Sequence, residues 1–120
     1  MPRKILIADD EEEIIELLKS LFERAGYSIV STTSGSRLPI LVQKEKPDLL
    51  ILDILLPGLD GYSLQLQFSQ EEATKDLPVI VITALPAART LFEEFKQVKL
   101  FLNKPFDTEI LLNKVKEILG

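Results

Sequence analysis

A short aliphatic run that ends in one carboxylate constrains this chain more than any other feature. Residues 49–52 are all leucine or isoleucine, Asp53 follows them directly, and turn residues come next at Pro57-Gly58 and Asp60-Gly61. A carboxylate rarely follows so apolar a run without a partner. Asp53 therefore either caps the end of a strand, or lies in the crevice where α/β sheets bind ligands at the carboxyl ends of parallel strands.

Four more apolar runs have the length of buried strands and are bounded by polar or turn residues. They lie at residues 4–8, 27–31, 78–83 and 99–102. Apolar residues at helical spacing are clearest in residues 11–25, where acids fill the first turn and Gly26 provides a stop. A weaker helix is expected around Pro39, since proline is tolerated only near a helix start.

The segment after Gly61 is ambiguous. Its apolar residues alternate with polar ones, which is the period of a strand, at Tyr62, Leu64, Leu66 and Phe68. We nevertheless predict a helix there. The runs on either side have the composition of parallel buried strands, and a parallel crossover needs about a dozen residues, usually helical.

Two more helices are expected in the last third of the chain. The first opens at Pro86 and carries four apolar residues on one side, Ala88, Leu91, Phe92 and Phe95. The second follows Asp107, a suitable N-cap, and directs four apolar residues inward, Leu111, Val115, Ile118 and Leu119.

This alternation of strands and helices predicts a single three-layer α/β domain over residues 1–120, with a parallel sheet and right-handed crossovers. Four of the five strands end in polar side chains, Asp9-Asp10, Asp53, Thr83 and Lys104. Because the carboxyl ends of parallel strands share one edge of the sheet, we expect these side chains to meet in one crevice. Their coincidence favours the second interpretation of Asp53.

The composition excludes several kinds of site. Without cysteine or histidine, the chain can form neither a disulfide nor a thiolate or imidazole metal site. The net charge of −5, from 14 basic and 19 acidic residues, argues against direct binding of nucleic acid. No segment has the pattern of a signal peptide or a membrane span, so no membrane association and a cytoplasmic location are expected.

The polar strand ends predict phosphoryl chemistry. Three carboxylates in one crevice repel unless a cation lies among them, and the oxygen ligands of Asp9, Asp10 and Asp53 suit Mg²⁺. Lys104 provides a charge for a phosphoryl group, and Thr83 a hydroxyl that can hydrogen-bond one of its oxygens. An aspartate can itself become an aspartyl phosphate. Each residue alone also has a plain explanation, as a helix charge, a cap or a solvated lysine.

Five motifs make the chain resemble, over nearly its whole length, the CheY-like receiver domain of two-component response regulators. They are Ile-Leu-Ile-Ala-Asp-Asp-Glu at 5–11, Pro-Asp-Leu-Leu-Ile-Leu-Asp at 47–53, Leu-Pro-Gly-Leu-Asp-Gly at 56–61, Pro-Val-Ile-Val-Ile-Thr-Ala at 78–84 and Leu-Asn-Lys-Pro-Phe at 102–106. Any one motif is weak evidence, but five in order are specific. The resemblance implies a doubly wound, flavodoxin-like (βα)5 fold with strand order 2-1-3-4-5.

The resemblance also implies a phosphorelay role, in which the domain is a signalling switch and not an enzyme. Asp53 would accept a phosphoryl group from a sensor histidine kinase or a histidine phosphotransfer protein. Mg²⁺ would bind Asp10 directly, Asp9 mainly through water, and Asp53 and the backbone carbonyl of Leu55. Lys104 would bind the phosphoryl group, and its peptide bond to Pro105 would be cis.

The implied switch lies downstream of Asp53. Thr83 would move toward the phosphate while Phe101 changes rotamer. The face made by the helix from Pro86, the strand at 99–102 and the helix after Asp107 would then change shape, for a downstream effector or for dimerisation.

The chain departs from the family's usual pattern at the output face and beside the acceptor. Phe101 lacks the hydroxyl of a tyrosine, so its outward state would expose a bare ring. Residues 95–98 replace the small residues and glycine that are common there. Leu55 and Leu85 flank the approach of water to Asp53 and cannot orient it, so we predict slow self-dephosphorylation.

Three alternative functions are weighed against this one. A phosphatase of the haloacid dehalogenase type would need a second acid two residues after Asp53, where this chain has Leu55. A flavodoxin-like cofactor carrier would need hydroxyls after the first strand, but the acids at 9–13 repel an anionic ligand. A degenerate receiver, acting as an interaction module without phosphorylation, is opposed by the intact set of Asp, Thr and Lys residues.

Overall fold

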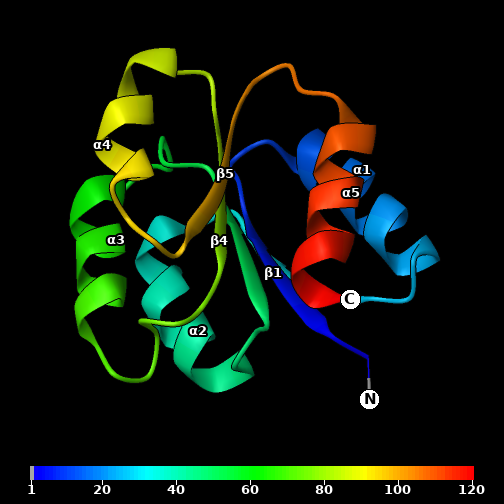
Figure 1. Ribbon diagram of the computed structural model, residues 1–120, viewed down its shortest axis with the longest axis horizontal. Coiled ribbons are helices and arrows are strands. Elements are labelled where there is room, and N and C mark those ends of the chain that lie inside the picture. The colour runs from blue at the N-terminus through cyan, green and yellow to red at the C-terminus, as the bar shows by residue number, and fades with distance from the viewer. Residues whose placement is uncertain (1) are drawn as a thin grey trace.

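Five parallel strands form one sheet at the centre of the computed structural model, which describes residues 2–120 (Figure 1). Neighbouring strands pair in the order β2-β1-β3-β4-β5, so the predicted doubly wound topology is confirmed. The strands are β1 Lys4–Ala8, β2 Ser28–Thr32, β3 Leu49–Leu52, β4 Val79–Thr83 and β5 Val98–Asn103.

Helices cover both faces of the sheet. On one face lie α1 and α5, and on the other lie α2, α3 and α4 (Figure 1). Two 3₁₀ turns, Gly35–Arg37 and Pro86–Ala88, directly precede α2 and α4. The helices are α1 Glu12–Arg24, α2 Leu38–Glu45, α3 Gly61–Gln70, α4 Arg89–Glu93 and α5 Thr108–Leu119.

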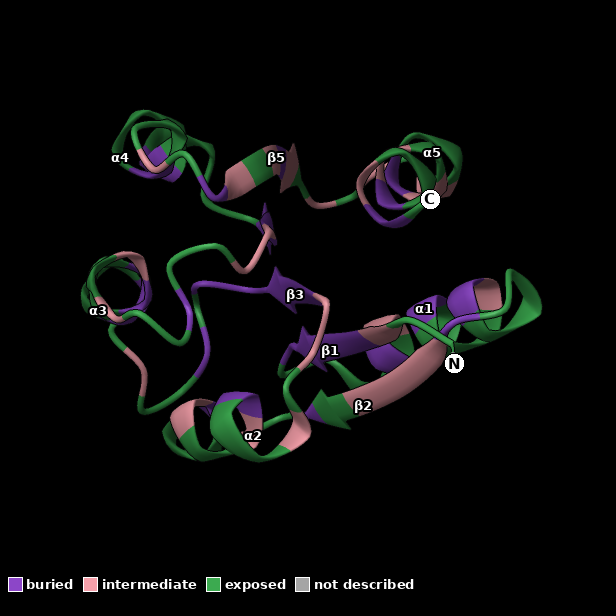
Figure 2. Cartoon of the chain, turned by 60° about the horizontal axis from the view of Figure 1, so that its bottom comes forward, coloured by how far each residue is buried: buried purple, intermediate pink, exposed green. Residues whose placement is uncertain are grey.

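The three central strands, β1, β3 and β4, are continuous apolar runs because both of their faces are buried, whereas the edge strands β2 and β5 are partly exposed (Figure 2). Successive side chains of a strand point to opposite faces. In β3, Leu50 and Leu52 therefore join the core under α2, α3 and α4, whereas Leu49 and Ile51 join the core under α1 and α5. All four side chains are buried. Because β3 is the central strand, Asp53 follows at the middle of the sheet's carboxyl edge.

The first helix ends as its sequence predicts. Gly26 has a φ of +97°, and the amide of Tyr27 donates to the carbonyl of Phe22, which closes the helix in a Schellman-type motif. The Tyr27 ring also packs edge-on against the Phe22 ring. The buried stripe includes Ile15, whereas Leu17 is 47% exposed and faces away from the core.

The ambiguous segment after Gly61 is the helix α3, as predicted. Asp60 caps it by accepting a hydrogen bond from the amide of Ser63, and this bond holds the pKa of Asp60 below its usual value. Leu64 and Phe68 are buried, while Tyr62 and Leu66 are each 38% exposed. The apparent strand period arises because inward and outward positions of the helix both carry apolar side chains.

The prediction of one helix from Pro86 through Phe95 is wrong in its extent. A 3₁₀ turn occupies Pro86–Ala88, and α4 contains only Arg89–Glu93, with Leu91 52% exposed instead of buried. After α4, the amide of Phe95 donates to Phe92 and that of Val98 donates to Phe95, so the chain tightens into three-residue turns. The other boundaries differ from expectation by a residue or two.

Two buried glutamines differ in whether their side-chain amide NH₂ groups are hydrogen-bonded. Neither amide atom of Gln65 hydrogen-bonds another atom in residues 2–120, although the side chain is fully buried. Gln97 is also buried, but its Nε2 donates to the carbonyls of Thr74 at 3.0 Å and Leu77 at 2.8 Å. Gln97 therefore ties the turn after α4 to the loop between α3 and β4.

We expect Gln65→Leu to raise the free energy of unfolding by about 1 kcal/mol, because it removes an unpaired buried amide. Gln97→Leu should lower it by about 1–3 kcal/mol, because two buried carbonyls lose their donor. Urea unfolding midpoints at constant m-value measure both changes. A loss of stability in both variants would show that Gln65 has a partner after all.

Candidate functional site

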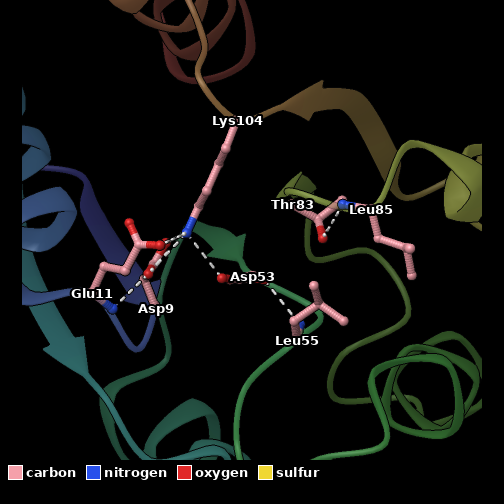
Figure 3. Close-up of polar contacts among 7 residues, drawn as sticks. All are labelled: Asp9, Glu11, Asp53, Leu55, Thr83, Leu85 and Lys104. Atoms are coloured by element: carbon pink, nitrogen blue, oxygen red, sulfur yellow. Dashed lines mark hydrogen bonds and ion pairs between the residues drawn. The ribbon is translucent and has the colours of Figure 1, made fainter.

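The polar residues predicted to converge lie together at the carboxyl edge of the sheet (Figure 3). In the pairing of β1 with β3, Ala8 lies opposite Leu52, which brings Asp9 beside Asp53. The backbone amide of Asp53 donates to the carbonyl of Ala8 at 2.9 Å. On the other side, the amide of Lys104 donates to the carbonyl of Thr83 at 2.8 Å, so β5 delivers Lys104 to the same edge.

The ammonium group of Lys104 lies among three carboxylates (Figure 3). Its Nζ is 2.9 Å from Asp9 Oδ2, 3.0 Å from Asp53 Oδ2 and 3.6 Å from Glu11 Oε1. The side chains of Asp9, Asp53 and Lys104 are 4%, 5% and 11% exposed. These charges are therefore shielded from water, and each depends on the others for compensation.

The surroundings shift the pKa values of two of these groups. Burial raises the pKa of Asp9, although hydrogen bonds from the Glu11 amide and the Lys104 ammonium partly offset the shift. For Lys104, burial by itself lowers the pKa, but the hydrogen bonds to Asp9 and Asp53 and their negative charges outweigh it. The pKa of Lys104 lies above its ordinary value, so the side chain is a cation at neutral pH.

Backbone donors orient both buried carboxylates. Asp53 Oδ1 accepts a hydrogen bond of 2.9 Å from the amide of Leu55, and Asp9 Oδ1 accepts one of 2.8 Å from the amide of Glu11. The chain after Asp53 also needs Gly61, because a Cβ there would lie 2.8 Å from the Cβ of Ile54. This close approach folds the loop after β3 back against the start of α3.

The acidic residues fit a divalent cation. Carboxylate oxygens of Asp9, Asp10 and Asp53 lie within 4.8 Å of one another, with Asp10 exposed and the other two buried. The nearby ammonium of Lys104 leaves this group with net negative charge. An all-oxygen donor set of one or two carboxylates with room for water is the kind of site that Mg²⁺ prefers.

The remaining predicted residues lie in or shortly after β3, β4 and β5. Thr83 is fully buried, and its hydroxyl accepts a hydrogen bond of 3.2 Å from the amide of Leu85. Leu55 is 49% exposed and Leu85 is 44% exposed, and Figure 3 draws them beside Asp53 and Thr83 respectively. Phe101 is buried, and the peptide bond between Lys104 and Pro105 is cis.

The sequence did not point to two polar contacts. Glu11 pairs with Lys104, but in the sequence it looks like one more acid at the start of a helix. Arg89 donates a hydrogen bond to the carbonyl of Phe101, and its guanidinium lies over the Phe101 ring. No local pattern links Arg89 with Phe101, because they lie on different elements of the fold.

Of residues 2–120, no helix has the length and apolarity needed to cross a membrane.

Comparison with known proteins establishes the family. Residues 5–116 match the model of the response regulator receiver domain, and the chain therefore belongs to that family. It is 36% identical, over 99% of its length, to the DNA-binding dual master transcriptional regulator RpaA of Synechocystis, and 29% identical to protein PilH of Pseudomonas aeruginosa over 98% of both chains. The chain spans 49% of RpaA, about half its length.

Solved structures agree with this assignment. A protein described as a response regulator from Chloroflexus aurantiacus is 36% identical and superposes with a TM-score of 0.89, over 99% of this chain and 98% of that one. Response regulator TrrA of Thermotoga maritima, solved in complex with Mg²⁺-BeF, is 31% identical with a TM-score of 0.85, over 98% of this chain and 99% of that one. The chain therefore has the fold of a CheY-like signalling domain.

Proposed function

We propose that this receiver domain accepts a phosphoryl group on Asp53 from the phosphohistidine of a sensor kinase or phosphotransfer protein in the cytoplasm. The geometry around Asp53 carries the proposal. Its buried carboxylate lies 3.0 Å from the Lys104 ammonium. One of its oxygens also lies within 4.8 Å of carboxylate oxygens of Asp9 and Asp10. A carboxylate so placed, with a cation beside it, can attack a phosphorus atom whose oxygens the same cation binds.

The reaction would transfer the phosphoryl group without a net redox change. A carboxylate oxygen of Asp53 forms a bond to phosphorus as the bond from phosphorus to the histidine nitrogen breaks, and the imidazole leaves with that electron pair. Lys104 binds a phosphoryl oxygen, and the Thr83 hydroxyl donates a hydrogen bond to another.

The proposed Mg²⁺ ligands are Asp10, Asp9 through water, Asp53 and the backbone carbonyl of Leu55. When bound, Mg²⁺ would neutralise charge on the carboxylates and the phosphoryl oxygens. The donor set of three neighbouring carboxylates supports this assignment. TrrA, a relative 31% identical to this chain, was solved in complex with Mg²⁺-BeF, which also favours it.

The proposed output is a binding event. The face of α4, β5 and α5 would recruit a downstream effector or a second copy of the chain. The relative RpaA is described as a DNA-binding regulator, but the net charge of −5 argues against contact between this domain itself and nucleic acid. An Asp-nucleophile phosphatase is less favoured, because Leu55 stands where its general acid would be.

Beryllofluoride or acetyl phosphate in the presence of Mg²⁺ should modify wild-type protein at one site, and Asp53→Asn should remain unmodified. The fluorine NMR signal and the intact mass measure the two adducts. Chelation of Mg²⁺ with EDTA should abolish both, because three carboxylates would then repel the incoming anion. An adduct that forms equally in Asp53→Asn would rule out this acceptor.

Phosphorylated Asp53 should be long-lived, because the exposed side chains of Leu55 and Leu85 offer no polar atom to orient an attacking water. Leu55→Asn should accelerate hydrolysis on the order of tenfold. The measurement is the decay of phosphoprotein after removal of the donor, followed by mass spectrometry. Ile40→Asn, at an exposed residue of α2, is the matched control. Equal decay of wild type and Leu55→Asn would refute the role of Leu55.

A hollow of about 360 Å³ beside Lys104 favours this place for docking of a protein donor. Its apolar lining comes from α1, from the residue after β4 and from the segment after β5, namely Ile14, Leu17, Ala84, Pro105 and Phe106. Leu17 is half-exposed, so a partner helix that covered it would remove apolar surface from contact with water, which favours binding.

Leu17→Asp should slow transfer from a phosphohistidine protein about tenfold, which corresponds to about 1.4 kcal/mol of lost apolar burial. Phosphorylation by acetyl phosphate should be unchanged, because a small donor does not need the hollow. Ile40→Asp controls for an exposed apolar-to-acid change elsewhere. If Leu17→Asp slowed both donors equally, the hollow would not be the docking place.

A further inference from the structure

Arg89, the first residue of α4, makes two contacts that join α4 to β5 and one within α4. Its guanidinium carbon lies 5.1 Å from the centroid of the Phe101 ring. Nη2 donates a hydrogen bond of 3.1 Å to the carbonyl oxygen of Phe101, and Nη1 donates one of 2.9 Å to Glu93 Oε1. The guanidinium thus holds both the ring and the backbone of one residue, and Glu93 fixes its orientation.

The Phe101 ring is enclosed between this guanidinium and an aromatic cluster. Phe101 is 3% exposed, and its ring centroid lies 6.4 Å from that of Phe92. Phe92 in turn packs against Tyr62 of α3 and Phe95 of the turn after α4, at centroid distances of 6.1 and 6.4 Å. The Arg89 side chain is 47% exposed, so it lies between this cluster and the solvent.

These contacts favour the buried position of Phe101. An outward ring would lose the cation–π contact with Arg89 and its packing against Phe92. Phenylalanine has no hydroxyl with which to find a polar partner on the surface. The contacts of Arg89 involve none of the residues of the acidic centre, whose cation is Lys104.

We propose that Arg89 locks Phe101 in its buried position whatever the state of Asp53, so that the face of α4 and β5 is preset in this chain. This replaces the expected change of rotamer at Phe101. A partner that recognises the face with Phe101 buried would bind before phosphorylation, and the phosphoryl group would add only the movements of Thr83 and the loop after β4. The inference rests on the proposed function, since it concerns regulation of that function's output face.

The test is fluorine NMR on protein labelled with 4-fluorophenylalanine, with exposure of each ring measured by broadening from a soluble nitroxide. The chain has six phenylalanines, and Phe101→Leu identifies the resonance of interest. In wild type, the Phe101 resonance should be equally protected before and after addition of Mg²⁺ and beryllofluoride. In Arg89→Ala without beryllofluoride, its exposure should rise about two- to fivefold, as expected for loss of an exposed cation–π contact.

Two matched variants separate the contact from the charge. Arg89→Lys keeps the charge but loses the planar fork that holds both ring and carbonyl, so the exposure of Phe101 should be intermediate. Lys99→Ala removes an exposed cation of β5 whose Nζ donates to the carbonyl of Lys96, and Phe101 should stay protected. Thermal melts verify that each variant is folded.

Two results would overturn the lock. One is equal exposure of Phe101 in Arg89→Ala and wild type before beryllofluoride is added. The other is a wild-type resonance that becomes better protected once the adduct forms. The first comparison needs no phosphoryl analogue, so it tests Arg89 even if Asp53 fails to form an adduct, which would count against the proposed function alone.

Discussion

The acidic edge of the sheet depends on the ion pairs of the partly buried Lys104 ammonium. Asp9 and Asp53 leave neighbouring strands with little exposure to water, and at close range two such carboxylates repel. Lys104 bridges them at 2.9 and 3.0 Å. Loss of one partner from a buried pair generally costs about 3–5 kcal/mol, because the remaining charge is uncompensated. The site is therefore held by mutual charge compensation as much as by the strands.

The register of the sheet makes this compensation possible. Ala8 lies opposite Leu52, and Thr83 lies opposite Asn103, so the residues that follow these pairs reach the same height at the sheet edge. A slip of one residue would turn each side chain of β3 to the opposite face of the sheet, and so into the other of the two cores, where it does not fit its neighbours. The same hydrophobic burial that selects the register thus also brings Asp53 within reach of Lys104. Stability and site geometry have one physical origin here.

The two ends of the proposed signalling path differ in their physical character. The acceptor end is ionic and depends on a few short contacts around Lys104. The opposite end, around α4 and β5, is aromatic and is closed by Arg89 over Phe101. Thr83 is the last residue of β4, and its hydroxyl accepts a hydrogen bond from the amide of Leu85 at the entrance to the turn before α4. This bond ties the carboxyl end of β4 to the start of that turn.

The sequence by itself determined the topology and the identity of the acidic edge. Continuous apolar runs locate the central strands because both faces of these strands are buried, and polar residues at the ends of the runs mark Asp9, Asp53, Thr83 and Lys104 as neighbours. Only the tertiary structure decided the length of α4 and the contact of Arg89 with Phe101. These depend on packing between segments far apart in sequence, such as the bonds from Gln97 to Thr74 and Leu77. Local propensity does not encode such contacts, because their energy exists only once the elements have met.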